Sequence, residues 1–143
     1  MLPFTPRLRI ALATAEEYAK SEQRRDVSCH DIINGIVSLN DCGVATSLLK
    51  QRGFQPGAIL RVPQDKLNHE VTSYSPDALR ALSAAMEDAV SRSYTLIGTE
   101  DMLIGILSPP SAEISGLFKQ KDINIEELLA DVRKQLSPGP KDP

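Results

Sequence analysis

The sequence of 143 residues has no long apolar run and no excess of basic residues. A helix that crosses a membrane needs about 20 consecutive, mainly apolar residues, and no stretch approaches that length, so we expect no membrane insertion. The chain carries 16 Lys and Arg against 19 Asp and Glu, a net charge of −3. This balance offers no positive field to a phosphodiester backbone, which excludes nucleic acid as an expected partner.

Cysteine and histidine are too sparse to indicate a metal site or a disulfide framework. Cys29 and Cys42 form no CxxC or CxxH motif, and His30 and His69 stand apart from other ligand types. We therefore expect buried thiols, no metal and no cofactor. The N-terminal residues lack the basic and apolar regions of a targeting signal, so the cytoplasm is the expected location.

The common catalytic signatures are also missing. The sequence contains no GxxxxGK(S/T) phosphate loop, no GxGxxG, no GxSxG and no HExxH motif, which are the signatures of many nucleotide-binding proteins, hydrolases and zinc proteases. No nucleophile and base are suggested at any spacing. We expect a protein that is not an enzyme.

An internal repeat is the main positive feature of the chain. Pro6 corresponds to Pro76 and Gly35 to Gly105, a shift of 70 positions in both cases, with no gap between these points. Such a period determines the architecture before any local pattern is considered. It predicts one domain, residues 1–143, that contains a first repeat at about 4–62, a linker at 63–73, a second repeat at about 74–136 and a disordered tail at 137–143.

Helix signals follow the same order in both repeats. A hydroxyl residue followed by proline, at Thr5 and again at Ser75, is typical of a helix N-terminus and predicts long helices to about Ser21 and Ser93. Shorter helices are expected from a cap at Ser28 to about 39, at 44–53, at 58–62, from a cap at Thr99 to 107, around 114–118, and from Asn124 to about 136. No segment shows convincing strand alternation. The predicted fold class is all-α, with two four-helix repeats related by a pseudo-twofold axis.

A glycine interrupts the same short helix in each repeat. Gly35 and Gly105 each cost the helix about 1 kcal/mol relative to alanine. Because both copies keep this cost, we predict that another helix packs closely against each glycine.

The repeated unit resembles a known family. The residues that carry the resemblance are Phe4-Thr5-Pro6-Arg7, Tyr74-Ser75-Pro76-Asp77, and the run Gly98-Thr99-Glu100 with Leu103-Ile104-Gly105-Ile106-Leu107. They resemble the Clp N-terminal repeat found at the front of Clp/Hsp100 AAA+ unfoldases such as ClpC, ClpA and ClpB, over about residues 4–136. The resemblance implies an all-α pseudo-dimer that docks substrate and adaptor proteins and has no ATPase activity of its own.

The resemblance also implies candidate site residues. In the ClpC branch, each repeat binds a phosphorylated arginine through the hydroxyl residue that starts the first helix and the glutamate of the Gly-Thr-Glu motif. A carboxylate pairs with the guanidinium, and a helix N-terminus offers N–H groups to the phosphate. Carried over repeat by repeat, the first site takes Thr5, Arg7 and His30, and the second takes Ser75, Thr99 and Glu100.

By this pairing each site lacks one part, since His30 replaces a glutamate and Asp77 replaces an arginine. Another interpretation stays open for the remaining residues. Helix capping alone explains Thr5, Ser75 and Thr99, and an acid in the first turn stabilises its own helix, which explains Glu100.

The sequence thus predicts a non-enzymatic protein-binding module of the Clp system. Its expected partners are a Clp ATPase, a Clp peptidase, and adaptor or substrate proteins. It could be the N-domain of an unfoldase or a free-standing accessory protein similar to the chloroplast ClpT proteins, and the Met1 start and proline-rich end favour the second. The alternative is an all-α sensor or sequestering protein that binds a small molecule in an apolar groove between the repeats.

Overall fold

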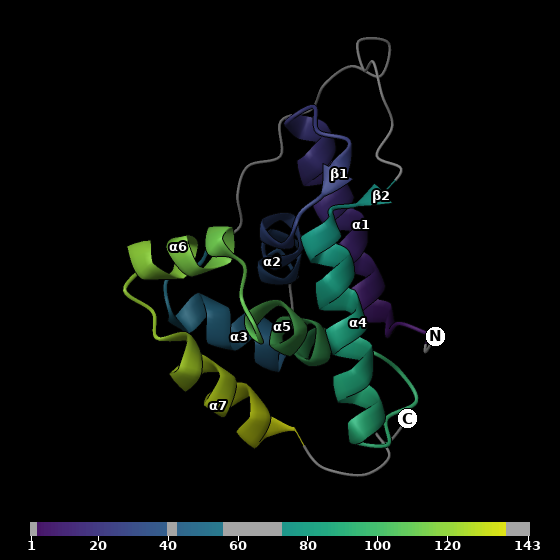
Figure 1. Cartoon of the computed structure of the whole chain (residues 1–143), viewed down its shortest axis with the longest axis vertical. Coiled ribbons are helices and arrows are strands. Elements are labelled where there is room, and N and C mark those ends of the chain that lie inside the picture. The colour runs from purple at the N-terminus through teal and green to yellow at the C-terminus, as the bar shows by residue number, and fades with distance from the viewer. Residues whose placement is uncertain (1–2, 40–42, 56–72, 137–143) are drawn as a thin grey trace.

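The structure is a computed structural model that describes residues 3–39, 43–55 and 73–136. Within these ranges the chain forms seven helices and two very short strands (Figure 1). In order they are α1 (Pro6–Ser21), β1 (Asp26–Val27), α2 (Cys29–Val37), α3 (Val44–Gln51), β2 (Ser73–Tyr74), α4 (Pro76–Ser91), α5 (Thr99–Leu107), α6 (Ala112–Gln120) and α7 (Ile125–Gln135). The all-α fold class is confirmed. No helix in the described ranges is both long and apolar enough to span a membrane.

Three predicted segments fall outside the described residues. They are the helix at 58–62, nearly all of the linker, and the tail at 137–143. Ser73, expected at the end of the linker, instead begins β2. The long helix of the second repeat ends at Ser91 rather than near Ser93, because Ser93 adopts a left-handed conformation with φ of 60°.

Side-chain caps start the helices as the sequence predicts. The hydroxyls of Thr5 and Ser75 each accept a hydrogen bond of 3.1 Å from the backbone N–H three residues later. Ser28 and Asp31 form a reciprocal capping box, with bonds of 2.9 and 3.2 Å. Asn124 caps α7 in the same manner. These bonds satisfy N–H groups that have no partner inside a helix.

Thr99 is not the cap that the sequence predicts. Gly98 is the N-cap of α5, and its backbone N–H donates to the carboxylate of Asp101 at 2.8 Å. Thr99 is therefore the first helical residue, and its hydroxyl donates to the carboxylate of Glu100 at 2.7 Å. The Thr99 hydroxyl holds a neighbouring side chain in place and does not cap the helix.

The two helix glycines allow the close packing that was predicted. A Cβ atom on Gly35 would clash with the carbonyl oxygen of Ala11 and lie 3.3 Å from the backbone nitrogen of Ala15. A Cβ atom on Gly105 would clash in the same way with Ala81 and lie 2.9 Å from the nitrogen of Ala85. Helix α2 thus packs directly on the backbone of α1, and α5 on that of α4.

The repeats share one hydrophobic core. Buried side chains from both repeats form a single cluster, and every residue of α5 is buried. Figure 1 shows α2 and α5 in the middle of the molecule, between the long helices and the group formed by α3, α6 and α7. Between the repeats, the rings of Phe54 and Phe118 lie 5.1 Å apart and Arg52 forms an ion pair with Asp131.

Candidate docking sites at the helix starts

Two short segments of parallel backbone pairing link the repeats, and they determine which helix starts lie side by side. β1 pairs with β2, and Phe4 forms an isolated parallel bridge with Ile97. The N–H of Thr5 donates to the carbonyl of Ile97, and the N–H of Ser75 donates to that of Val27, both at 2.9 Å. The start of α1 therefore lies beside the segment that enters α5, and the start of α4 lies beside the segment that enters α2.

Because of this crossing, the candidate residues can be grouped by neighbouring helix starts instead of repeat by repeat. Thr5 and Arg7 lie at the α1 start, which is joined to the approach to Thr99 and Glu100. Ser75 and His30 line one pocket at the other end. We call the first group the α1–α5 site (Thr5, Arg7, Thr99 and Glu100) and the second the α2–α4 site (Ser28, His30, Ser75 and Asp77). The first holds the hydroxyl, arginine and glutamate of the expected set, and the second lacks both charged members.

In the α1–α5 site a carboxylate is held in a largely buried position. Glu100 is only 9% exposed, and its carboxylate accepts the hydrogen bond from Thr99 described above. The guanidinium of Arg7 lies directly against Gly43, the N-cap of α3, where any side chain at position 43 would collide with it. The site thus combines a carboxylate, a guanidinium and two helix starts with their first-turn N–H groups.

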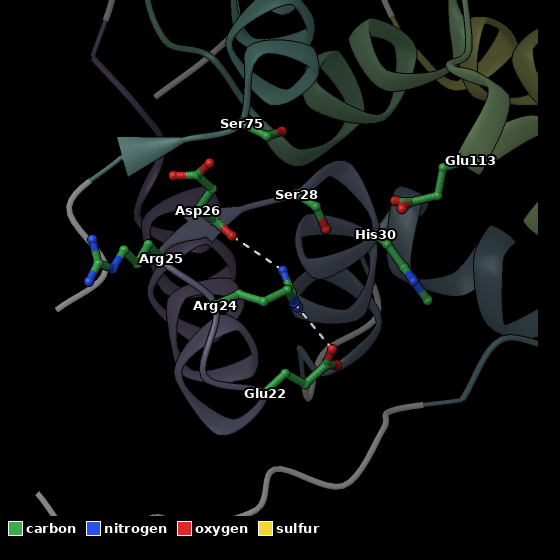
Figure 2. Close-up of a pocket in the computed structure, with 8 residues that line it drawn as sticks. All are labelled: Glu22, Arg24, Arg25, Asp26, Ser28, His30, Ser75 and Glu113. Atoms are coloured by element: carbon green, nitrogen blue, oxygen red, sulfur yellow. Dashed lines mark hydrogen bonds and ion pairs between the residues drawn. The ribbon is translucent and has the colours of Figure 1, made fainter. Parts of the chain in front are cut away.

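The α2–α4 site opens into a pocket of about 540 Å³ (Figure 2). His30 from α2 and Glu113 from α6 lie on one side of it, and Arg25 lies at the opposite edge. The full lining comprises Glu22, Arg24, Arg25, Asp26, Ser28, His30, Ser75 and Glu113. These side chains are all polar, with charges of both signs.

Arg24 is committed to a structural ion pair beside this pocket. Its two terminal nitrogens donate to both oxygens of the buried Asp31 at 2.7 and 2.6 Å, and its Nε lies 3.2 Å from Glu22. The hydrogen bond with Asp31 is the main reason that the pKa of Arg24 is raised. The pair anchors the loop between α1 and α2 to the capping box of α2.

Asp77 occupies the position that corresponds to Arg7, and it is held by three side chains. Its carboxylate accepts a hydrogen bond of 3.1 Å from Nε of Arg80, and its other partners are the thiol of Cys29 and the hydroxyl of Ser111. Burial opposes ionisation, but these three hydrogen bonds outweigh it and lower the pKa of Asp77. Burial, together with the nearby carboxylate, raises the pKa of Cys29, which stays a thiol. Asp77 is thus a carboxylate at neutral pH.

Sequence reasoning missed several residues of the α2–α4 site. Nothing in the linear pattern indicated that Arg24 pairs with Asp31, or that Ser111 and Glu113 at the start of α6 lie beside the other repeat. Cys29 is buried and free, as predicted; Cys42 and His69 lie outside the described residues. Among the residues that the structure describes, no group of three or more His, Cys, Asp or Glu side chains could hold a metal ion.

Comparisons with known proteins agree with the fold. Residues 3–120 match the family described as the Clp repeat (R) N-terminal domain. A curated relative, the ATP-dependent Clp protease ATP-binding subunit ClpC of Staphylococcus aureus, is 22% identical over 137 residues. That match covers 92% of this chain and 17% of the relative, so the chain spans only a small part of its length.

Two solved structures share the fold. The N-terminal domain of the chaperone ClpD from Arabidopsis thaliana has a TM-score of 0.67 at 16% identity, with 92% of this chain and 93% of that chain covered. The Hsp104 N-terminal domain from Candida albicans has a TM-score of 0.73 at 14% identity, with 95% and 94% covered. Because the sequence match extends over most of the chain and the repeated helices have the matching fold, this protein belongs to the Clp repeat N-terminal domain family.

Proposed function

We propose that this protein is a non-enzymatic docking module of the cytoplasmic Clp system, which binds substrate or adaptor proteins or regulates a Clp ATPase. Family membership and the relatives named as Clp ATP-binding subunits support a role within this system. In this proposal its partners are a Clp ATPase, a Clp peptidase, and the adaptor or substrate proteins delivered to them.

The observation that carries the proposal is the composition of the α1–α5 site. The crossing between repeats joins the start of α1, with Thr5 and Arg7, to the segment that leads into Glu100. The family resemblance assigns Thr5 and Arg7 to one phosphoarginine site and Glu100 to the other, and the backbone pairing between the repeats supports a single site that combines the three. We therefore propose that this site binds a phosphorylated arginine of a docked protein.

The chemistry of each group suits such a ligand. The carboxylate of Glu100 would pair with the guanidinium part, a charge-assisted hydrogen bond worth about 1.5 to 3 kcal/mol. Arg7 and the first-turn N–H groups of α5 would face the phosphoryl oxygens, because a helix N-terminus favours negative charge. Thr99 holds the Glu100 carboxylate in place through its 2.7 Å hydrogen bond.

Calorimetric titration with a peptide that contains phosphoarginine tests this proposal. We expect binding to the wild-type protein and a loss of at least about tenfold in affinity for Glu100→Gln, which corresponds to about 1.4 kcal/mol. The matched control is Glu126→Gln, which removes an equally early carboxylate from α7, where it is exposed. Equal affinity of the wild type and Glu100→Gln would contradict the assignment of Glu100.

A second experiment tests the Clp role independently of the ligand. The purified chain is immobilised and challenged with purified Clp ATPase, Clp peptidase and a phosphoarginine-labelled substrate protein, each alone. Retention of the substrate that is lost with Glu100→Gln supports substrate docking, whereas retention of the ATPase supports a regulatory role. If none of the three is retained, the proposed function is wrong.

No observation on the described residues favours the small-ligand alternative. That hypothesis requires an apolar groove between the repeats. The pocket in Figure 2 does lie between elements of both repeats, but all eight residues that line it are polar.

A further inference from the structure

The two helix-start sites differ in charge at one equivalent position. Arg7 and Asp77 are the second residues of α1 and α4 and are separated by the 70-residue period. Each side chain reaches the N-terminus of the next helix in its site. Arg7 lies against Gly43, the N-cap of α3, and Asp77 contacts Ser111, the N-cap of α6.

The carboxylate of Asp77 brings a negative charge to a cluster of helix starts. It lies where the starts of α2, α4 and α6 meet, since its partners are Cys29 at the first position of α2, Arg80 of α4 and Ser111 of α6. Helix N-termini attract negative charge, and here a side chain of the protein itself supplies that charge. A second anion at this point would have to displace Asp77 or approach it against electrostatic repulsion.

The neighbouring side chains act in the same direction. Asp77 is 33% exposed, so its negative charge also faces solvent at the site. The nearby pocket is lined by three further carboxylates, those of Glu22, Asp26 and Glu113, and His30 stands where the other site has Glu100. Three arginines are nearby: Arg24 is paired with Asp31 and Arg80 with Asp77 itself, whereas Arg25 lies at the far edge of the pocket from His30 and Glu113.

We propose that Asp77 closes the α2–α4 site to anionic groups, so that the protein docks a phosphorylated side chain at the α1–α5 site alone, with one such group per chain. This inference rests on the proposed function, which places the anion-binding site at the α1–α5 site. It adds that the residue at position 77 determines whether the α2–α4 site can also bind an anion. The two sites of the duplicated chain thus differ: the α1–α5 site accepts an anion, whereas the carboxylate of Asp77 already occupies the α2–α4 site.

A titration followed by ¹⁵N–¹H NMR tests the inference residue by residue. Phosphoarginine and, separately, inorganic phosphate are added to the wild-type chain, to Asp77→Asn, to Asp77→Arg and to the control Glu87→Gln. The control removes one carboxylate from an exposed position on the same helix, so it matches the change in net charge of Asp77→Asn. The amides of Thr99 and Glu100 report the α1–α5 site, and those of Cys29 and His30 report the α2–α4 site.

We expect phosphoarginine to shift only the α1–α5 amides of the wild type and of Glu87→Gln. In Asp77→Asn and Asp77→Arg, inorganic phosphate should shift the Cys29 and His30 amides, with an apparent affinity there at least about tenfold above that of the wild type. Saturable shifts at both ends of the wild-type chain would overturn the inference and leave the proposed function standing.

Absence of shifts at Thr99 and Glu100 in the wild type would count against the proposed function instead. In that case the Asp77 variants still decide the inference through the phosphate titration. Gain of binding at Cys29 and His30 supports it, and no gain in either well-folded variant overturns it. The wild-type titration needs no substitution, so a variant that fails to fold does not remove the test.

Discussion

Two glycines determine how closely the short central helices approach the long ones. At Gly35 and Gly105 any side chain would collide with backbone atoms of the opposing helix. Backbone atoms of a packed helix cannot move aside as the end of a flexible side chain can, because the interior is close-packed. Close packing therefore requires glycine at these two positions, despite its low helix propensity.

Replacement of either glycine by alanine should destabilise the protein. We expect Gly35→Ala and Gly105→Ala each to lower the free energy of unfolding by at least about 2 kcal/mol, since overpacking outweighs the gain in helix propensity. Gly116→Ala is the matched control. A Cβ atom there would meet nothing within 4 Å, so a gain of about 0.5 to 1 kcal/mol is expected. Urea unfolding measures all three, and a neutral Gly105→Ala would contradict the packing argument.

Asp77 should make the stability of the protein depend on pH in the acid range. Its hydrogen bonds lower its pKa in the folded state, whereas the unfolded carboxyl titrates near about 3.9. Its stabilising contribution is therefore complete above that value and disappears as the pH falls through the lower, native pKa. Urea midpoints for wild type and Asp77→Asn should differ at pH 7 and converge towards pH 2. A constant difference across this range would show that Asp77 does not contribute through its charge.

At the scale of the elements, the sequence predicted helix starts well because capping is a local property. Thr5, Ser75, Ser28 and Asn124 each cap through a residue three positions away, and all four positions were predicted. Thr99 was wrongly predicted as a cap because a glycine with suitable backbone angles can take that position when Asp101 accepts its N–H. A hydroxyl residue near a helix start does not by itself identify the cap.

The pairing of the helix starts could not be predicted in the same way. It depends on β1, β2 and the bridge between Phe4 and Ile97, which are too short to produce a hydrophobic period. Within a duplicated chain, the simplest assumption is that each repeat builds its own site. The connections instead join the start of each long helix to the segment that enters the short central helix of the other repeat. The candidate residues stay a prediction, and the grouping proposed for them comes from these connections.

The ion pair between Arg24 and Asp31 should stabilise the protein more than the exposed ion pair between Arg24 and Glu22 does. Asp31 is nearly fully buried and also completes the capping box with Ser28. We expect Asp31→Asn to cost about 2 to 4 kcal/mol, because one partner of a largely buried pair is lost together with a cap. Glu22→Gln removes the exposed partner of the same arginine and should cost less than about 1 kcal/mol. Equal effects in urea unfolding would contradict this distinction.

At the scale of the whole molecule, the two repeats share a fold but differ in the charged residues at their helix starts. Their long helices, central helices and glycine contacts correspond, and buried residues of both belong to one cluster. The helix starts at the two ends carry opposite charges at positions 7 and 77. A shared core keeps the structure of both ends fixed while the polar residues at each end differ, because those residues contribute little to the core itself.

The shared core leads to a prediction about cooperativity. Leu49 of α3 and Phe118 of α6 are both fully buried, one in each repeat, and the ring of Phe118 packs at a tilt against that of Phe54 across the interface. We expect Leu49→Ala to cost about 2 to 5 kcal/mol and Phe118→Ala about 3 to 5 kcal/mol. Because both side chains contact one core, each substitution should lower the temperature of a single transition rather than split it.

Calorimetry should give equal calorimetric and van't Hoff enthalpies for the wild type and for both variants, as expected for a two-state domain. Two separate transitions in either variant would mean that the repeats unfold independently, and the single-domain prediction for residues 1–143 would then be wrong.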